Sequence, residues 1–342
     1  MPSVLSSYAV ETYNSATRIP DYIWQAMIDS PCNSNIMLPH AESAKAHAYA
    51  GQPTEGIWIA CITSSPSSPR RVDFILSCTS NHLGANPIFI FTTIPPAGHA
   101  SEDVTSRLTS MAHALLRSVP VERVFSVFAP DHITRTFTSV WTDITGISLA
   151  EDPEYYAAKI SYCTRSSFRP RSNSSLPDVQ YELRLAREDD ASAVAQLCYG
   201  FAIESPPFTL TMQNALREAS MKISNGQLWV HEIRSPGQSA EIASIVAVTR
   251  TSSTVAAITK VYTNPRWRKR GCAERLVRKV CKHLLKTKDS VVLYVAHENP
   301  AAAKVYHRVG FLGLGPETEP VDGVDDWLEL GFDRSRVVLG HW

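Results

Sequence analysis

The sequence predicts an α/β protein of the α+β kind, built from two similar domains. The chain has 342 residues, a length that suits two domains better than one. Both halves show the same order of predicted elements: a helical region, a hairpin, a strand, a helix, a strand, a helix and a strand. A polar segment rich in serine and proline separates them and is typical of a linker. We therefore expect a first domain at residues 1–163, a linker at 164–178 and a second domain at 179–342.

Charge and composition exclude several classes of protein. Lysine plus arginine and aspartate plus glutamate number 33 each, so net charge does not favour nucleic acid or an anionic membrane as partner. No run approaches the roughly 20 apolar residues of a membrane span, and the first eight residues lack the features of a secretory signal. The seven cysteines are scattered without a Cys-x-x-Cys pair, which indicates reduced thiols and no zinc site. We expect a cytoplasmic protein, with a nuclear location as the alternative.

The first half reads as alternating helices and strands. Apolar periodicity, β-branched runs and turn residues mark each element. In order, they are a mainly helical region at 19–51, two strands of a hairpin at 55–65 and 71–79, a strand at 87–93, a helix at 101–119 capped by Ser101, a strand at 121–128 and a helix at 132–145.

The second half repeats this order. Its predicted elements are a strand at 181–187, a helix capped by Asp189 or Asp190 and broken at 204–208, a second helix to about 224, strands at 228–233 and 242–251, a strand at 256–263, a helix from 273, a strand at 291–295 and a helix that contains Tyr306.

A basic turn lies between the strand at 256–263 and the next helix. Asn264-Pro265 ends the strand, and Gly271 follows three cations, Arg268, Lys269 and Arg270. A helix N-terminus has unpaired N–H groups and a partial positive charge, and glycine lets an anion approach the backbone closely. The turn therefore predicts a phosphate site, with an ordinary solvated turn as the alternative. The patterns of a P-loop and of a dinucleotide fold are both absent.

Two motifs in the second half resemble the GNAT superfamily of N-acyltransferases. The first is Val261-Tyr262-Thr263-Asn264-Pro265-x-x-Arg268-x-x-Gly271-x-Ala273, which is similar to the family's acyl-CoA-binding motif, Gln/Arg-x-x-Gly-x-Gly/Ala. The second runs from Glu298-Asn299-Pro300 through Tyr306 to Gly310-Phe311. The resemblance covers roughly residues 181–342. It implies two GNAT-like domains, each a mixed, mostly antiparallel sheet flanked by helices.

The resemblance also implies a cofactor site for acetyl-CoA as co-substrate. The pyrophosphate would bind the backbone N–H groups of Arg270, Gly271, Cys272 and Ala273 and the side chains of Arg268, Lys269 and Arg270. The pantetheine arm would pair with the backbone of Val261 and Thr263 and meet the side chain of Asn299. Asn299 before Pro300 is also an ordinary start of a helix.

Catalytic residues are implied in the same way. Tyr306 matches the family's general acid, and an unperturbed phenol is protonated at neutral pH; the alternative is an ordinary core residue. In some members of the family, a glutamate on the fourth strand acts as the general base, and this chain has Ala257 at that position. We rank Glu298 first as the general base. The alternatives are His297, Glu232, His231 or a chain of water molecules.

The first half departs from the family at the site. Ile94-Pro95-Pro96-Ala97-Gly98-His99-Ala100 replaces the basic turn, and Phe137 and Trp141 stand where a tyrosine is expected. We therefore expect the first domain to be a degenerate copy that does not bind acyl-CoA and has a structural role.

The predicted activity is N-acetylation of a primary amine on a small molecule or amino acid. The first alternative is a non-catalytic acyl-CoA-binding or interaction protein, and the second is an O-acyltransferase on the same fold. Nucleic-acid binding is the least supported function, because no aromatic ladder accompanies the short basic patch. The oligomeric state, monomer or homodimer, stays open.

Overall fold

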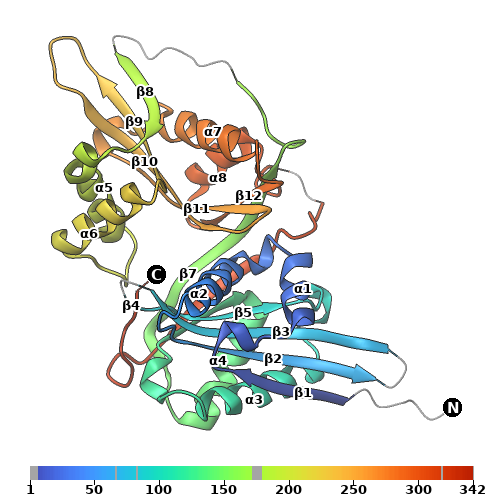
Figure 1. The fold of residues 1–342 in the computed structure, drawn as a ribbon. Helices are drawn as coiled ribbons and strands as arrows, with labels where there is room; N and C mark the ends of the chain where they lie inside the picture. Colours follow the sequence, from blue (N-terminus) through green and yellow to red (C-terminus); the bar gives the residue numbers. More distant parts are fainter. Residues whose placement is uncertain (1–6, 66–67, 82–83, 172–178, 317–318, 342) are drawn as a thin grey trace. The chain divides into compact units, whose positions relative to one another are not determined.

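A computed structural model describes residues 7–65, 68–81, 84–171, 179–316 and 319–341 (Figure 1). The chain divides into two compact units. The first unit contains residues 1–158 and 325–342, and the second contains residues 159–324. None of the helices within the described ranges has both the length and the apolar character needed to cross a membrane.

The first unit is a sheet with helices. Its elements in chain order are β1 (Ser7–Tyr13), α1 (Asp21–Asp29), α2 (Leu38–Tyr49), β2 (Gly56–Ser65), β3 (Ser68–Asn81), the short β4 (Gly84–Ala85), β5 (Ile88–Thr92), α3 (Glu102–Leu116), β6 (Ser126–Pro130), α4 (Asp131–Thr145), most of β7 (Leu149–Thr164) and β13 (Asp326–Phe332).

The sheet of the first unit has the order β1-β2-β3-β5-β6-β13. Neighbouring strands run antiparallel except β5 and β6, which are parallel. Helices α3 and α4 bury their apolar faces against the strands, and Met111 and Phe137 are fully buried in this core. The predicted cap of α3 is confirmed, because the Ser101 hydroxyl accepts the N–H of Val104.

The second unit repeats the same plan. Its elements are the end of β7, then β8 (Gln180–Leu185), α5 (Ala191–Ile203), α6 (Met212–Ser224), β9 (Leu228–Arg234), β10 (Glu241–Thr251), β11 (Val255–Thr263), α7 (Cys272–Leu284), β12 (Ser290–Ala296) and α8 (Pro300–Val309).

Helices cover both faces of the second sheet, whose order is β12-β11-β10-β9-β8. The strands are antiparallel except for β11 and β12. Side chains alternate between faces along a strand: Val246 packs with α7 and α8, whereas Ile245 packs with α5 and α6. Figure 1 shows α5 and α6 grouped on one side of β10 and β11, and α7 and α8 on the other.

The predicted repeat is confirmed in the order of the elements. From β1 to β7, leaving out β4, and from β8 to β13, the chain runs strand, helix, helix, three strands, helix, strand, helix, strand. The second-half strands and helices predicted around the basic turn and Tyr306 are all present within a few residues of their expected bounds.

The units do not coincide with the halves of the sequence. Strand β13 ends the second repeat, yet it pairs antiparallel with β6 and belongs to the first unit. Conversely, residues 159–164 of β7 end the first repeat and belong to the second unit, where β7 lies next to β12. The expected domains at 1–163 and 179–342 therefore differ from the units by one exchanged strand each.

Three local predictions need correction. The strand expected at 121–128 begins at Ser126, because Val121–Arg123 forms a 3-10 turn after Pro120. Strand β1 was not predicted, although its alternating side chains are typical of a half-buried strand. Asp190 does not cap α5 with its side chain; the carboxylate instead pairs with Arg184.

The first part of the expected linker is attached to the second unit. The N–H of Arg169 donates to the carbonyl of Val309 at the end of α8, and the guanidinium of Arg278 on α7 donates to the carbonyl of Arg169. Residues 172–178 lie outside the described residues.

The exchange of β13 predicts a stability effect at the end of the chain. Phe332 is fully buried in the core of the first unit, so Phe332→Ala should destabilise that unit by about 3–5 kcal/mol. Leu339, which is 39% exposed, is a control whose replacement by alanine should change stability by about 0.5 kcal/mol or less. Urea unfolding checks both. Equal, small effects of the two substitutions would contradict the place of β13 in this core.

Candidate functional site

Strands β11 and β12 pair over only part of their length within the described residues. Their parallel register covers Val255–Ala257, while β11 continues to Thr263 and β12 to Ala296. Against β10, the register of β11 shifts between Ala257 and Lys260, where Thr259 of β11 and Thr249 of β10 are both passed over. Such a bulge disrupts the ladder locally. The edge of β11 beyond Ala257 is thus left without a strand partner.

Backbone groups of Val261 and Thr263 point toward this unpaired edge. The N–H of Asn264 donates to the carbonyl of Ala243 on β10, at 2.9 Å. Since alternate residues of a strand direct their N–H and C=O to opposite sides, Tyr262 faces β10 and its two neighbours face away. The carbonyl of Thr263 accordingly accepts a hydrogen bond from Arg268, at 3.2 Å. The backbone groups of Val261 and the N–H of Thr263 therefore face the open edge, whereas the carbonyl of Thr263 is engaged by Arg268.

The basic turn has a backbone shape suited to anions. Lys269 and Gly271 have φ angles of 62° and 73°, in the left-handed region. Glycine adopts this conformation readily, and a Cβ at Gly271 would lie 3.0 Å from Nη1 of Arg275. The first N–H groups of a helix lack intrahelical partners, and Gly271 has no side chain that could cap those of α7. Cys272 contributes only its backbone here, because its side chain is buried.

The predicted phosphate ligands Arg268, Lys269 and Arg270 differ in their surroundings. Lys269 and Arg270 are exposed at the turn, and the guanidinium of Arg270 lies 4.8 Å from the ring centre of Trp267. Arg268, by contrast, is held by other side chains. The turn therefore presents two exposed cations and one engaged cation.

Arg268 is held by Glu204, a contact that the sequence did not reveal. Glu204 follows α5, and both its oxygens lie 2.8 Å from Nη2 of Arg268. The Tyr262 hydroxyl donates to the same carboxylate at 2.7 Å. Partial burial alone would raise the pKa of Glu204, but the hydrogen bonds from Tyr262 and Arg268 outweigh it and lower the pKa. Burial, followed by the bond to Glu204, raises the pKa of Tyr262 to about 12.

Tyr306 lies in the core between α7, α8 and the sheet. Its side chain is 8% exposed and packs edge-on against Phe311, with ring centres 5.7 Å apart. Burial raises the pKa of its hydroxyl, so the group is protonated at neutral pH. Among the described residues this hydroxyl has no hydrogen-bond partner, and it is available as a proton donor.

Asn299 and Glu298 lie at the start of α8. The Asn299 side chain caps the helix by accepting the N–H of Ala302 at 3.0 Å, with Pro300 at the first position, so the predicted cap is confirmed. Glu298 and His297 are exposed in the preceding turn. The structure does not bring Glu298 into a contact that would activate it.

The other two candidates for a general base are unsuited to it. Glu232 forms an ion pair with Arg184, which also forms one with Asp190. His231 is fully buried; burial, then the charge of Arg275, lowers its pKa to about 4. His231 is neutral at physiological pH but has no route to solvent for its proton.

The corresponding turn of the first unit lacks these features. Residues Pro96–Gly98 form a 3-10 turn, and His99 hydrogen-bonds to the carbonyl of Ile94 at 2.8 Å. The Ser101 cap already uses an N–H group at the start of α3. Phe137 and Trp141 stack at 6.2 Å in the helix that corresponds to α8. The first unit therefore has neither an open helix start nor a tyrosine at this position.

Comparison with known proteins identifies the fold. Residues 239–318 match the family described as FR47-like protein. No protein of curated function matches the chain in sequence. A tandem GNAT protein from the clavulanic acid biosynthesis pathway is 12% identical, with a TM-score of 0.50 over 94% of this chain and 98% of that chain.

Two further solved structures have a similar fold. A Drosophila protein is 9% identical, with a TM-score of 0.59 over 95% of this chain and 99% of its own. A GCN5-related N-acetyltransferase from Sphaerobacter thermophilus is 14% identical, with a TM-score of 0.54 over 94% of each chain. At such identities the likeness concerns the fold. The chain has the tandem GNAT fold, and the resemblance found in the motifs is confirmed.

The burial of His231 predicts a pH-dependent stability. Its pKa is about 4 when folded and near 6.5 when unfolded, so the unfolded state binds more protons between these values. Lowering the pH from 7 to 5 should therefore cost about 2 kcal/mol of unfolding free energy through this residue. His231→Leu should remove that part of the loss, whereas replacing the exposed His113 should not. An unchanged pH slope in His231→Leu would disprove the effect.

Proposed function

We propose that this tandem GNAT protein is an acyl-CoA-dependent acyltransferase whose second unit carries the active site. The observation that carries the proposal is the turn before α7. It combines a left-handed Gly271 and an uncapped helix start with a neighbouring strand edge that has lost its partner. These are the two features that a pyrophosphate followed by an extended, amide-containing arm requires.

We further propose that the acyl donor is acetyl-CoA. The N–H groups of Arg270, Gly271, Cys272 and Ala273 would bind its pyrophosphate, assisted by the exposed side chains of Lys269 and Arg270. Arg268 would join them once released from Glu204.

The strand and the start of α8 would bind the rest of the donor. Val261 and Thr263 would pair with its amide groups, and Asn299 would meet the same arm while it caps α8. When bound, the donor supplies an activated acyl group as a thioester.

Tyr306 is the proposed general acid. Its buried, protonated hydroxyl can donate to a departing thiolate. We retain Glu298 as the proposed base that accepts the acceptor's proton, because it precedes α8 and is exposed to solvent. The acceptor we propose is a primary amine of a small molecule or amino acid, and the reaction is N-acetylation.

A shift in thermal unfolding tests the donor site. Acetyl-CoA at about 100 times its dissociation constant should stabilise the protein by about 2.7 kcal/mol, whereas NADH and ATP should not. Gly271→Glu should abolish the shift, because it places a carboxylate where the pyrophosphate would bind. Gly271→Ala is the matched control, since it has the same unfavourable φ angle without the charge. Retained binding by Gly271→Glu would refute this site.

Replacing Tyr306 by phenylalanine separates its catalytic role from its packing. The hydroxyl has no partner within the described residues, so Tyr306→Phe should leave stability and acetyl-CoA affinity unchanged. The turnover number should fall by about 100-fold or more, as expected for loss of a general acid. The rate is measured as the amount of product formed over time, detected by its mass, from an amine that the wild type acetylates. Full activity in the variant would show that Tyr306 is a core residue without a catalytic role.

A further inference from the structure

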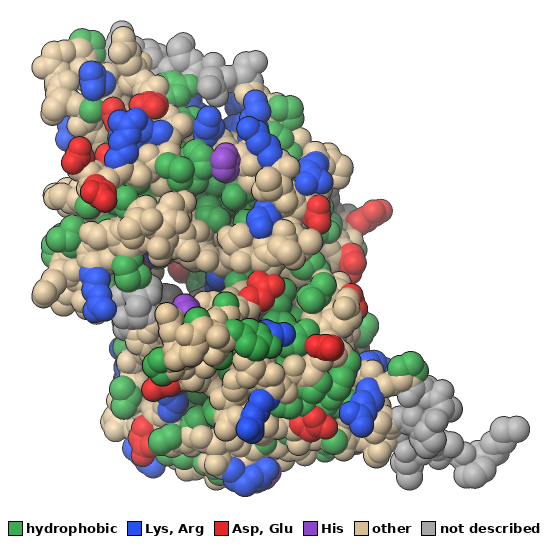
Figure 2. Space-filling view, viewed as in Figure 1, with side chains coloured by type: hydrophobic (Ala, Val, Ile, Leu, Met, Phe, Trp, Pro, Cys, Tyr) green, Lys and Arg blue, Asp and Glu red, His purple; other side chains and the backbone are tan. Residues whose placement is uncertain are grey.

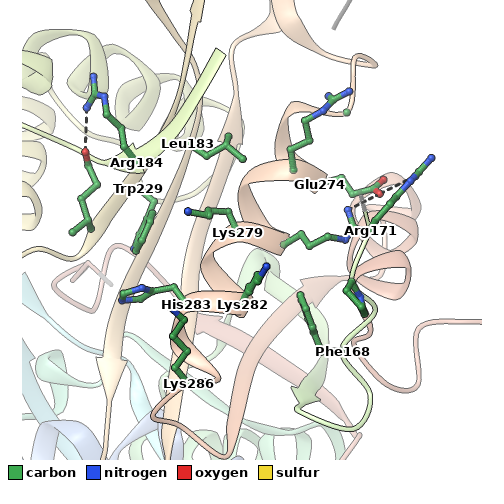
Figure 3. Close-up of a pocket in the computed structure, with 15 residues that line it drawn as sticks. Phe168, Arg171, Leu183, Arg184, Trp229, Glu274, Lys279, Lys282, His283 and Lys286 are labelled. Carbon is green, nitrogen blue, oxygen red and sulfur yellow. Dashed lines mark hydrogen bonds and ion pairs between the residues drawn. The ribbon is translucent and has the colours of Figure 1, made fainter. Parts of the chain in front are cut away.

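A groove runs along the outer face of α7 and shares only Gly271 with the proposed phosphate site. It has a volume of about 650 Å³, and Phe168 and Pro170 line one side of it, and the end of β8 and Trp229 the other. Figure 3 shows Lys279, Lys282 and His283 of α7, and Lys286 of the turn that follows it, around this groove. In Figure 2, basic side chains gather on the surface over the part of the molecule where Figure 1 shows α7.

Positive charge in this groove is not compensated within the described residues. Glu274 is the one carboxylate among the lining residues, and Arg171, Arg278 and Arg308 already bind it. Arg184 is likewise paired with Asp190.

The lysines at 279, 282 and 286 are exposed and form no ion pair with any described residue. Lys279 and Lys282 are three residues apart and so lie on one face of α7, and Lys286 lines the same groove from the turn after the helix. The charge of the groove therefore favours an anionic partner that carries several negative charges along its length.

Strand β8 provides an open sheet edge beside these lysines. It is the last strand in the order of its sheet. The N–H of Ala186 donates to Leu228 on β9, so the backbone groups of Leu183, three positions earlier, point the opposite way, to the outer edge. In the described structure these groups of Leu183 have no hydrogen-bond partner, whereas the carbonyl of Leu185 on the same edge accepts one from Arg184 at 3.1 Å. An open edge of this kind is a template for an additional strand.

The lining of the groove favours a peptide over a nucleic acid. Single-stranded nucleic acid binds by stacking bases on exposed aromatic faces. Trp229 is only 7% exposed and lies against His283, with ring centres 5.0 Å apart, so it offers no such face. Phe168 is the one other aromatic side chain in the lining and is half-buried, and the remaining apolar contacts include Leu183 and the 42% exposed Leu185. Alternate side chains of an extended peptide recur about every 6.6 Å, a spacing close to that of the lysines.

We propose that this groove binds an extended acidic peptide segment of a partner protein. The segment adds as a strand to the outer edge of β8. Its carboxylates, on alternate residues, pair with Lys279, Lys282 and Lys286, and its apolar residues lie on Leu183 and Leu185. The proposed peptide contacts do not include Gly271, the one lining residue that the proposed acyl transfer uses.

The test is fluorescence anisotropy of a labelled twelve-residue peptide of alternating valine and glutamate, with the full-length protein. The triple variant Lys279→Gln, Lys282→Gln, Lys286→Gln should weaken binding by about tenfold or more. Lys304→Gln, an exposed lysine on α8 outside the groove, is the matched control and should bind as the wild type does. No binding to the wild type, or equal binding by the triple variant, would overturn the proposal.

Three competitor experiments define the mode of binding. A peptide N-methylated at alternate residues cannot form the strand pairing, and equal affinity for it would overturn addition to β8. Oligothymidylate of the same charge should bind more weakly; tighter binding would assign the groove to nucleic acid instead. Saturating acetyl-CoA should leave the peptide bound. Displacement of the peptide would overturn the proposal, since the lysines would then bind the phosphates of the donor.

Discussion

The candidate site depends on the separation of β11 from β12. A sheet satisfies its backbone groups by pairing each strand on both sides, and an interior strand that loses one partner exposes polar groups within the fold. Here the pairing with β12 ends after Ala257, close to the bulge at Thr259, while β10 still pairs with the other edge of β11. The result is a rigid strand with one open edge, directly followed by the turn that opens α7. Binding groups on such a scaffold need little reorganisation to meet a ligand.

The contact between Glu204 and Arg268 couples two parts of this site. Glu204 follows α5 and Arg268 belongs to the basic turn, so an anion that attracts the arginine also competes with the carboxylate. Both partners are nearly half exposed, and such a pair contributes little to stability. An anionic ligand can therefore release Glu204 at small cost. The freed carboxylate would remain next to Tyr262, where a cationic group could replace the guanidinium.

Local signals account for what the sequence predicted. Ser101, the run at 256–263 and Asn299-Pro300 each determine a cap, a strand or a helix start within a few residues, and the structure contains all three. Two motifs in the right order were enough to predict the fold of the second repeat. The misses involve side-chain pairings that the pattern does not show: Asp190 binds Arg184 on the preceding strand instead of capping α5, and Glu204 meets Arg268 across 64 residues. The bulge at Thr259 likewise depends on the register with β10, which no single strand specifies.

The exchanged strands make each half of the chain depend on the other for completion. Residues 159–164 of β7 belong to the second unit, and β13 belongs to the first. Cleavage of the chain between the two repeats would yield fragments that each lack one strand of their own sheet and carry one that belongs to the other. Such fragments would have to reassociate to pair the backbone groups at the edges of their sheets, as in split-protein complementation. The duplicated sequence thus does not divide into two separable modules, because the last strand of the second repeat completes the first unit.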